Sequence, residues 1–185
     1  MTNHIPPDMA GLAIAGALLA VVSLLAAKKP RTFRIQRSVS VDAPAERVFA
    51  LIDTLNAWPR WSPQDRDDPT LTRSYSGPAA GTGAASDWTG SGSSGSGRML
   101  VTESVAPTRV SVQVDWEKPF VARNVNDFAL ERSGSSTKVT WMMHGPNLLV
   151  MRITSVFVNM DRMMGKHFDR GLANLKALAE QGSDR

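Results

Sequence analysis

A stripe of apolar side chains near the C-terminus sets the strongest limit on the fold of this chain. Between residues 147 and 181 these side chains recur at steps of three or four, at Met160, Met164, Phe168, Leu172, Leu175 and Leu178. This spacing places them on one face of an α-helix, and such a face needs an apolar partner. The opposite face carries Asp161, Arg162, Lys166, Asp169, Arg170 and Lys176. We therefore expect a long helix over residues 147–181 that packs one side against a sheet.

Segments with alternating apolar and polar side chains predict that sheet. The first strand covers residues 33–41, and a short amphipathic helix follows it up to Leu55. Six further strands are expected at residues 71–75, 84–89, 98–105, 110–116, 125–132 and 138–144. Arg37 falls on the apolar side of the first strand, which fits only an edge position. We expect residues 65–70 to form a solvated acidic loop.

Residues 90–97 read GSGSSGSG and formally contain the pattern G-x-G-x-x-G. A dinucleotide site needs a helix directly after this pattern, because the amides at the helix start hold the pyrophosphate. A segment rich in β-branched residues follows instead. The stretch is therefore interpreted as a flexible hairpin tip and not as a nucleotide site.

Residues 9–27 contain no charged side chain. At a rise of about 1.5 Å per residue, a helix of this length crosses a hydrocarbon core of about 30 Å. The rival interpretation is a cleaved secretory signal, but residues 1–7 contain no Lys or Arg for a positive n-region. We expect a single-pass membrane helix. Positive residues gather only after it, so the positive-inside rule places the following domain in the cytoplasm.

The distribution of charge favours a membrane surface over nucleic acid as the partner of the basic residues. The net charge is +4, and five of the 21 basic residues lie together at Lys28, Lys29, Arg31, Arg34 and Arg37. The remaining 16, from Ser38 onward, are matched by 16 acidic residues, so the domain itself is neutral. A basic cluster beside an apolar span is typical of contact with anionic lipid. The expected organisation is a tail at 1–8, a transmembrane helix at 9–27, a basic linker at 28–32, a domain at 33–181 and a tail at 182–185.

Seven short stretches carry a resemblance to a known family. They are RSVSVDAPAERVF at 37–49, WPRWSP at 58–63, YSGP at 75–78, WTG at 88–90, KPF at 118–120, TKVTW at 137–141 and FDRGL at 168–172. Together with the order of elements, they resemble the START-like superfamily, also called SRPBCC, and its small bacterial polyketide cyclase/dehydrase-like members. The resemblance implies an α+β helix-grip fold, in which a curved antiparallel sheet wraps a long C-terminal helix. It also implies an apolar cavity between them for lipids, polyketides or other hydrophobic small molecules.

The large side chains whose alternation points toward the long helix are the candidates for lining that cavity. They are Trp88, Met99, Trp116, Trp141, Met160, Met164 and Phe168, with Trp61 at the mouth. The same residues also suit the solid core of any protein that packs a helix on a sheet. The sequence leaves the choice between cavity and core open.

Catalytic candidates are few. Glu103 shares the parity of Met99 and Val101 and is the acid expected to point inward, and His144 is the histidine on a predicted strand. The chain has three histidines and no cysteine, so we expect no metal, no cofactor and no thiolate chemistry. The family offers no catalytic motif to transfer.

These observations favour a membrane-anchored, non-catalytic START-like domain that binds or shuttles a hydrophobic small molecule or lipid. The first alternative is an enzyme of the polyketide cyclase or dehydratase type, acting through a buried acid or histidine. The second alternative is an interaction scaffold with a filled core and an exposed apolar patch. Nucleic acid is not expected as a partner.

Overall fold

The computed structural model describes residues 7–181, and the chain forms two compact units. The first unit takes in the described part of the chain up to Arg31, together with Asn147–Met160. The second unit contains Thr32–Pro146 and the described residues from Asp161 onward. Residues 147–160, which the sequence alone places within the domain, thus belong to the unit of the N-terminal helix.

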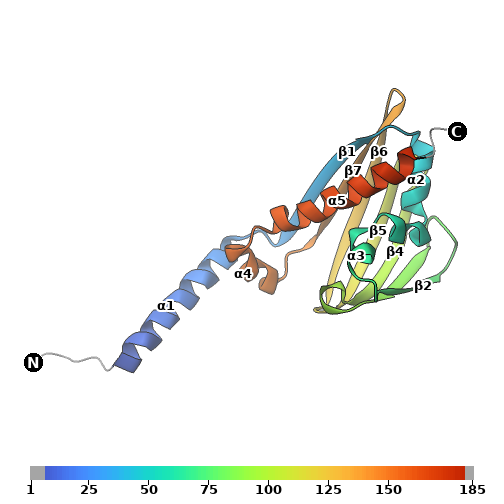
Figure 1. The fold of residues 1–185 in the computed structure, drawn as a ribbon. Helices are drawn as coiled ribbons and strands as arrows, with labels where there is room; N and C mark the ends of the chain where they lie inside the picture. Colours follow the sequence, from blue (N-terminus) through green and yellow to red (C-terminus); the bar gives the residue numbers. More distant parts are fainter. Residues whose placement is uncertain (1–6, 182–185) are drawn as a thin grey trace, which may run out of the picture. The chain divides into compact units, whose positions relative to one another are not determined.

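The second unit is built on one antiparallel sheet of seven strands (Figure 1). The strands are β1 Thr32–Val41, β2 Thr72–Ser76, β3 Ala85–Thr89, β4 Ser96–Val105, β5 Arg109–Lys118, β6 Ala122–Ser133 and β7 Ser136–Pro146. Their order is β1-β7-β6-β5-β4-β3-β2, so β1 and β2 are the edge strands. All seven strands predicted from alternation are confirmed, and Arg37 lies on an edge strand as expected.

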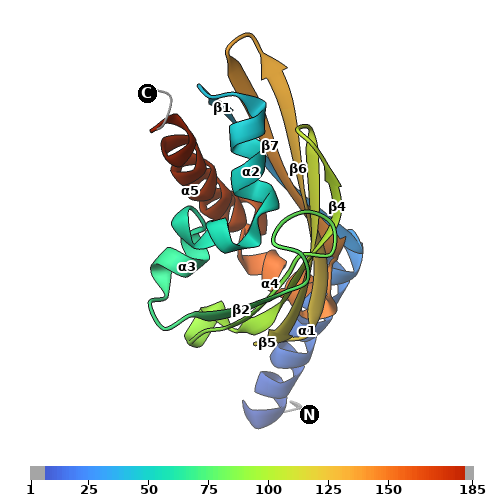
Figure 2. The same cartoon turned by 90° about the vertical axis from the view of Figure 1, so that its right-hand side faces the viewer.

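Helices cover one face of this sheet, here called the inner face (Figure 2). They are α2 Ala45–Asp53, the 3-10 helix η1 Leu55–Arg60, the short α3 Pro63–Asp67 and the long α5 Met160–Glu180. Helix α3 corrects the expected solvated loop at 65–70. Asp65 is buried in an ion pair with Arg73, and the buried Asp68 accepts hydrogen bonds from the backbone N–H groups of Thr70 and Ser91.

The expected continuous helix over residues 147–181 is in fact two helices. Helix α4 covers Leu149–Phe157 and α5 begins at Met160. Between them Val158 has extended backbone angles, with φ −122° and ψ 132°. The apolar repeat that marked the C-terminal helix falls entirely within α5, so the stripe itself is confirmed.

Helix α5 packs closely on the inner face because a glycine faces a tryptophan. The ring of Phe168 stacks on Trp141 of β7, with the centroids 4.1 Å apart and the planes at 4°. One turn later, a Cβ atom at Gly171 would lie 2.8 Å from Cζ3 of Trp141. The helix can approach this closely only because position 171 has no side chain.

An ion pair ties the start of α5 to the edge of the sheet. The guanidinium of Arg37 on β1 lies 3.1 Å from the carboxylate of Asp161 and 3.7 Å from that of Asp169. Gly165 faces the same guanidinium, which occupies the space a side chain there would need. The charged side chain on the apolar side of β1 is thereby explained, since α5 presents two acids to it.

The glycine- and serine-rich stretch 90–97 joins β3 to β4 as a hairpin connection, as predicted. It contains the single-turn 3-10 helix η2, Gly92–Ser94. The carbonyl of Ser94 accepts hydrogen bonds from Trp88 Nε1, at 2.9 Å, and from Gln64 Nε2, at 3.1 Å. Side chains from two neighbouring elements, β3 and α3, therefore hold this connection in place.

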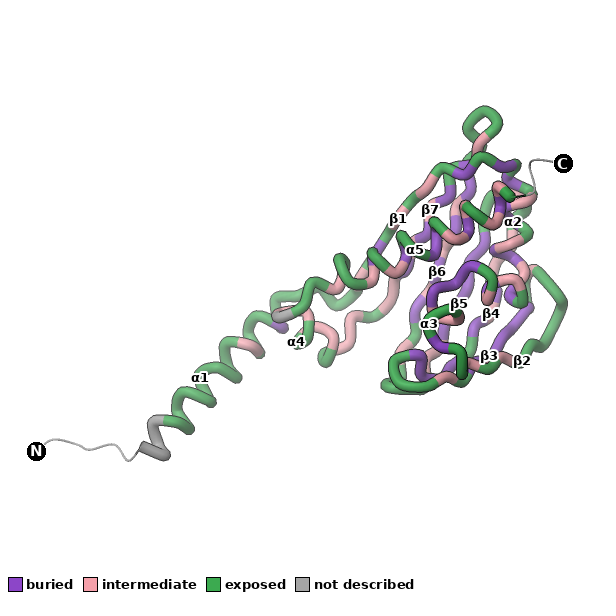
Figure 3. Tube along the Cα trace, in the orientation of Figure 1, coloured by how far each residue is buried: buried purple, intermediate pink, exposed green. Residues whose placement is uncertain are grey.

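The first unit consists of α1 Pro7–Lys28 and α4. Within the described part of the chain, α1 is the helix long and apolar enough to cross a membrane, over Gly11–Lys28. Nearly all of it is exposed (Figure 3). Helix α4 packs against α1, and Asn147 donates hydrogen bonds to the carbonyls of Pro30 and Arg31.

We expect Gly171→Ala to lower the free energy of unfolding by about 1–3 kcal/mol, because the added methyl group would overpack Trp141. Helix propensity alone predicts the opposite sign, since alanine favours a helix over glycine by about 1 kcal/mol. Urea unfolding of the two proteins measures the difference. The matched control is Ala173→Gly on the exposed side of the same helix, which should cost about 1 kcal/mol. A Gly171→Ala protein as stable as the wild type would show that the close approach is not required.

Candidate functional site

One end of the inner face is filled by aromatic rings. Trp61 contacts Trp58, Phe128 and Trp141, with centroid distances of 4.9, 6.2 and 5.8 Å. Phe128 also stacks on Trp141, which in turn stacks on Phe168. The indole N–H groups of this cluster have acceptors, as Trp58 donates to the carbonyl of Ile52 and Trp141 to Asn126 Oδ1. This end of the domain is a packed core.

The residues predicted to line a cavity therefore divide into two groups. Trp61, Trp88, Met99, Trp141 and Phe168 are buried. Trp61, Trp141 and Phe168 belong to the packed cluster, whereas Trp88 contacts Trp116 edge-on at 5.0 Å. Trp116, Met160 and Met164 are only partly buried. Met160 belongs to the first unit, and the other seven residues belong to the second. Their role as ligand contacts stays a prediction.

The other end of the inner face is more polar and less closely covered. Asn124 lies on β6 with the same parity as Asn126 and Phe128, so its side chain points to the inner side. Its neighbour across the sheet is the buried Val114, and the partly buried Trp116 lies one inward position along β5. Phe33 on edge strand β1 is partly buried as well. Partial exposure of large inward-facing side chains distinguishes this end from the aromatic cluster.

Asn124 is the most informative residue at this end. Its side chain is buried, with 9% of the residue exposed, and its Oδ1 atom has no hydrogen-bond partner among the described residues. Asn126, two residues along the same face, has its Oδ1 occupied by Trp141. A buried carbonyl oxygen without a donor costs about 1–3 kcal/mol. A ligand with an O–H or N–H group would remove that cost.

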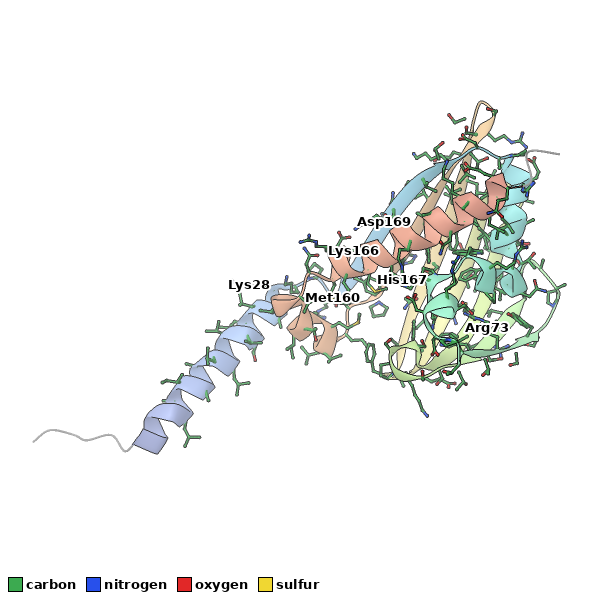
Figure 4. All side chains as sticks on the ribbon, viewed as in Figure 1. Lys28, Arg73, Met160, Lys166, His167 and Asp169 are labelled. Carbon is green, nitrogen blue, oxygen red and sulfur yellow. The ribbon has the colours of Figure 1, made fainter. Side chains whose placement is uncertain are left out.

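A buried ion pair adds polarity to the β2 side of the inner face. Arg73 Nε lies 2.6 Å from Asp65 Oδ1, and the two side chains are 5% and 7% exposed. The Arg73 guanidinium also reaches the hydroxyl of Ser86 at 3.4 Å and Sδ of Met99 at 3.9 Å. The pair joins α3 to β2, and its charges satisfy each other. Figure 4 labels Arg73 in this position.

His167 lies on α5 directly before Phe168, on the side of the helix away from Asp169 (Figure 4). Burial lowers the pKa of its imidazole, and the positive charge of Arg170 lowers it further, while Asp67 of α3 opposes the shift. The ring is therefore held in the neutral form at neutral pH. Among the described histidines, it is the one on the helix that covers the inner face.

Glu103 does not point inward, and the expectation from its parity is wrong. The register of β4 against β5 shifts between Val101 and Glu103, where a bulge interrupts the alternation. After the bulge, Glu103 lies opposite Ser111, whose side chain is on the outer face. Its carboxylate pairs with Arg109, and the Glu103 side chain is 43% exposed. Glu103 therefore has neither the burial nor the position of an inner-face acid.

His144 also lies on the outer face. Its neighbours Met143 and Gly145 on β7 have the opposite, inward parity. The imidazole Nε2 lies 2.9 Å from Asp127 Oδ2, and the Ser111 hydroxyl donates to Asp127 Oδ1 at 2.6 Å. These three side chains form a chain across β5, β6 and β7. The aspartate separates the serine from the histidine, so the imidazole cannot take the serine proton.

Within residues 7–181, no group of three or more His, Asp or Glu side chains is arranged to hold a metal ion. Hollows open at the surface of the second unit, and two of them are well defined. A groove of about 310 Å³ runs between β1 and α5 beside Val39 and Leu172, and a smaller hollow of about 150 Å³ lies beside Leu55 and Tyr75. None of the predicted cavity residues lines either hollow.

Sequence reasoning missed Asn124, Arg73 and Asp65. The sequence does indicate the direction of Asn124. Phe128 and Leu130 are apolar and point inward, and because alternate residues of a strand share a face, residues 126 and 124 point inward as well. The Arg73–Asp65 pair had no such signal. Asp65 comes from α3, where a solvated loop was expected, and Arg73 comes from the strand predicted at residues 71–75.

Comparisons with known proteins agree with this architecture. Residues 32–180 match the family model described as "Polyketide cyclase / dehydrase and lipid transport". No curated protein matches the chain.

Solved structures show the same fold at low sequence identity. A protein from Chromobacterium violaceum has 17% identity and a TM-score of 0.56, covering 82% of this chain and 99% of its own. Ara h 8.0201 has 10% identity and a TM-score of 0.56, covering 80% of this chain and 97% of its own. The di-domain ARO/CYC StfQ from the steffimycin biosynthetic pathway has 9% identity and a TM-score of 0.61, covering 83% and 52%.

We expect Asn124→Leu to raise the free energy of unfolding of the ligand-free protein by about 1–2 kcal/mol, because it removes an unpaired buried acceptor. The matched control is Asn126→Leu on the same face of the same strand. That change should lower stability by about 1–3 kcal/mol, since it leaves the Trp141 N–H without its acceptor. Urea unfolding measures both. Equal destabilisation by the two variants would contradict the distinct role given to Asn124.

The neutral form of His167 makes stability depend on pH. The unfolded chain binds a proton near the ordinary histidine pKa of about 6.5, whereas the folded chain binds it only at lower pH. The free energy of unfolding should therefore fall as the pH drops through about 6.5. Urea unfolding across this range should show a smaller fall in His167→Gln.

Arg170→Gln is the internal control for this assignment. It removes the positive charge beside the ring, so the pH dependence should weaken without vanishing. An unchanged pH profile in His167→Gln would assign the effect to other groups.

Proposed function

Because this chain belongs to the polyketide cyclase/dehydrase and lipid transport family, we propose that its second unit binds a hydrophobic small molecule or lipid against the inner face of the sheet. The single observation that carries the proposal is the buried Oδ1 of Asn124, which has no hydrogen-bond partner within residues 7–181. The ligand is an apolar molecule with at least one hydroxyl or N–H donor. Trp116, Phe33 and Met164 offer partly buried apolar surface to the rest of it.

The arrangement supports binding better than catalysis through the residues first considered. Glu103 and His144 both lie on the outer face, away from the proposed ligand. His167 is the titratable side chain that α5 brings beside the inner face, and its neutral imidazole has the form required of a general base. The family description and the steffimycin-pathway ARO/CYC neighbour support a cyclase-type reaction as the second candidate function. In that case His167 is the residue to test.

Membrane anchoring is the second part of the proposal. Helix α1 has the length and composition of a single span, and its basic residues follow at its C-terminal end. By the positive-inside rule, we expect the second unit to lie in the cytoplasm. Anchoring would keep the domain close to the membrane, where apolar ligands concentrate.

The test is native mass spectrometry of the full chain, extracted in mild detergent and incubated with total lipid extract. We expect a discrete adduct on the wild type. Loss of one hydrogen bond, worth about 0.5–1.5 kcal/mol, predicts an affinity about two- to tenfold weaker in Asn124→Leu.

Val125→Leu, on the opposite face of the same strand, is the matched control and should keep the wild-type affinity. Apo-protein that stays unchanged after incubation would contradict ligand binding and favour an interaction scaffold. The cyclase or dehydratase alternative would be established if the wild type released a dehydrated form of the small molecule and the His167→Gln variant did not.

A further inference from the structure

Helix α4 turns its apolar side outward. Leu149, Val150 and Ile153 are 59%, 53% and 38% exposed, and their spacing places them on one face of the helix. A helix on the surface of a water-soluble domain shows the reverse arrangement, with the apolar stripe facing the core. This exposed face therefore needs an apolar environment outside the described chain.

The polar groups of α4 are arranged for such an environment. The hydroxyl of Thr154 donates to the carbonyl of Val150, and that of Ser155 donates to the carbonyl of Arg152, both at 2.8 Å. Hydroxyls satisfied within their own helix present no unpaired donor to lipid.

The exposed face of α4 lies in the same compact unit as the proposed membrane span. From Gly11 to Lys28 every residue of α1 except Val22 and Ala26 is exposed, and α4 packs against α1. Asn147, at the entrance to α4, is bonded to Pro30 and Arg31 just after α1 ends. The entrance to α4 is thus fixed near the C-terminal end of α1, where Lys28 and Lys29 lie. Figure 4 labels Lys28.

We propose that α4 is a second membrane contact, which lies in the boundary between headgroups and acyl chains of the bilayer that α1 crosses. The inference rests on the membrane anchoring proposed above. At about 1.5 Å per residue, the nine residues of α4 are too short to span a hydrocarbon core of about 30 Å, so the helix lies along the interface. Leu149, Val150 and Ile153 enter the acyl region. The exposed basic residues at the end of α1 and after it, Lys28, Lys29 and Arg31, meet anionic headgroups.

A bilayer accounts for the observations better than a second copy of the chain. The exposed apolar surface includes nearly every side of α1 as well as one side of α4, and a single protein partner would cover only part of it. The neighbouring charges are basic, at Lys28, Lys29 and Arg31, which matches anionic lipid and would repel an identical unit.

Site-directed labelling of the full chain tests this proposal, and the absence of native cysteine makes each introduced thiol unique. Val150→Cys and Ile153→Cys are labelled with an environment-sensitive fluorophore and reconstituted in vesicles of phosphatidylcholine and phosphatidylglycerol. An interfacial helix buries its apolar face about 5–10 Å deep, so we expect strong quenching by lipids spin-labelled high on the acyl chain. Quenching by aqueous iodide should be about fivefold weaker than at the control Val121→Cys, which is 80% exposed in the second unit.

Two further measurements, labelling of Val21→Cys and dilution of the protein into excess lipid, distinguish the possible outcomes. Val21→Cys on α1 reports the anchor separately. If it is open to iodide, both the anchor and the proposed contact of α4 are overturned, whereas ligand binding by the second unit is unaffected. If Val21→Cys is shielded while Val150→Cys and Ile153→Cys are quenched by iodide as strongly as Val121→Cys, the anchor stands and the α4 proposal is overturned. Shielding at Val150→Cys that disappears on dilution of protein into excess lipid would assign the face to a second copy and also overturn it.

Discussion

The contact between Gly171, Phe168 and Trp141 is the constraint on which the second unit depends. A helix can grip a curved sheet only where its backbone comes close enough for large side chains on both to meet. The missing side chain at position 171 permits this approach, and the parallel stack of Phe168 on Trp141 uses it. Once these rings are in contact, Trp61 and Phe128 fill the remaining space at this end. The position of α5 then determines what remains uncovered elsewhere on the inner face.

Filling one end with rings confines any ligand to the other end, where the chain retains polar groups. A packed core with all donors and acceptors satisfied would be more stable than one that contains the free Oδ1 of Asn124. Asn126 shows that the same residue type on the same strand can be satisfied, because Trp141 donates to it. Buried polar groups without partners are rare in native proteins, so each one requires a physical explanation. The proposed ligand supplies the missing donor, and its apolar part replaces solvent beside Trp116 and Phe33.

The sequence alone predicted the strands and the C-terminal apolar stripe, but it did not predict the candidate site, for a physical reason. Alternation and helical spacing depend on burial alone, so they predicted all seven strands and the apolar stripe of α5. The inward direction of Glu103 failed because one bulge before it reverses every parity that follows. The break at Val158 was equally invisible, since residues 149–157 also have helical spacing. The lack of a partner at Asn124 depends on which atoms surround it in three dimensions. Parity can place this residue on the inner face, but no local pattern shows that its oxygen is unpaired.

The division of the chain into units has a mechanical consequence. The segment that carries α4 is inserted between β7 and α5, so the polypeptide passes between the two units three times, after Arg31, after Pro146 and after Met160. Two of these passages lie at the ends of β1 and β7, which are hydrogen-bonded neighbours in the sheet, and the third lies at the first turn of α5. The N-terminal helix is therefore not a detachable tether. Cutting the chain after residue 31 would remove one of the three connections and leave Asn147–Met160, the smaller part of the first unit, on the second unit. The first unit is therefore connected through the chain to the sheet, at β1 and β7, and also to the helix that packs on it, at the first turn of α5.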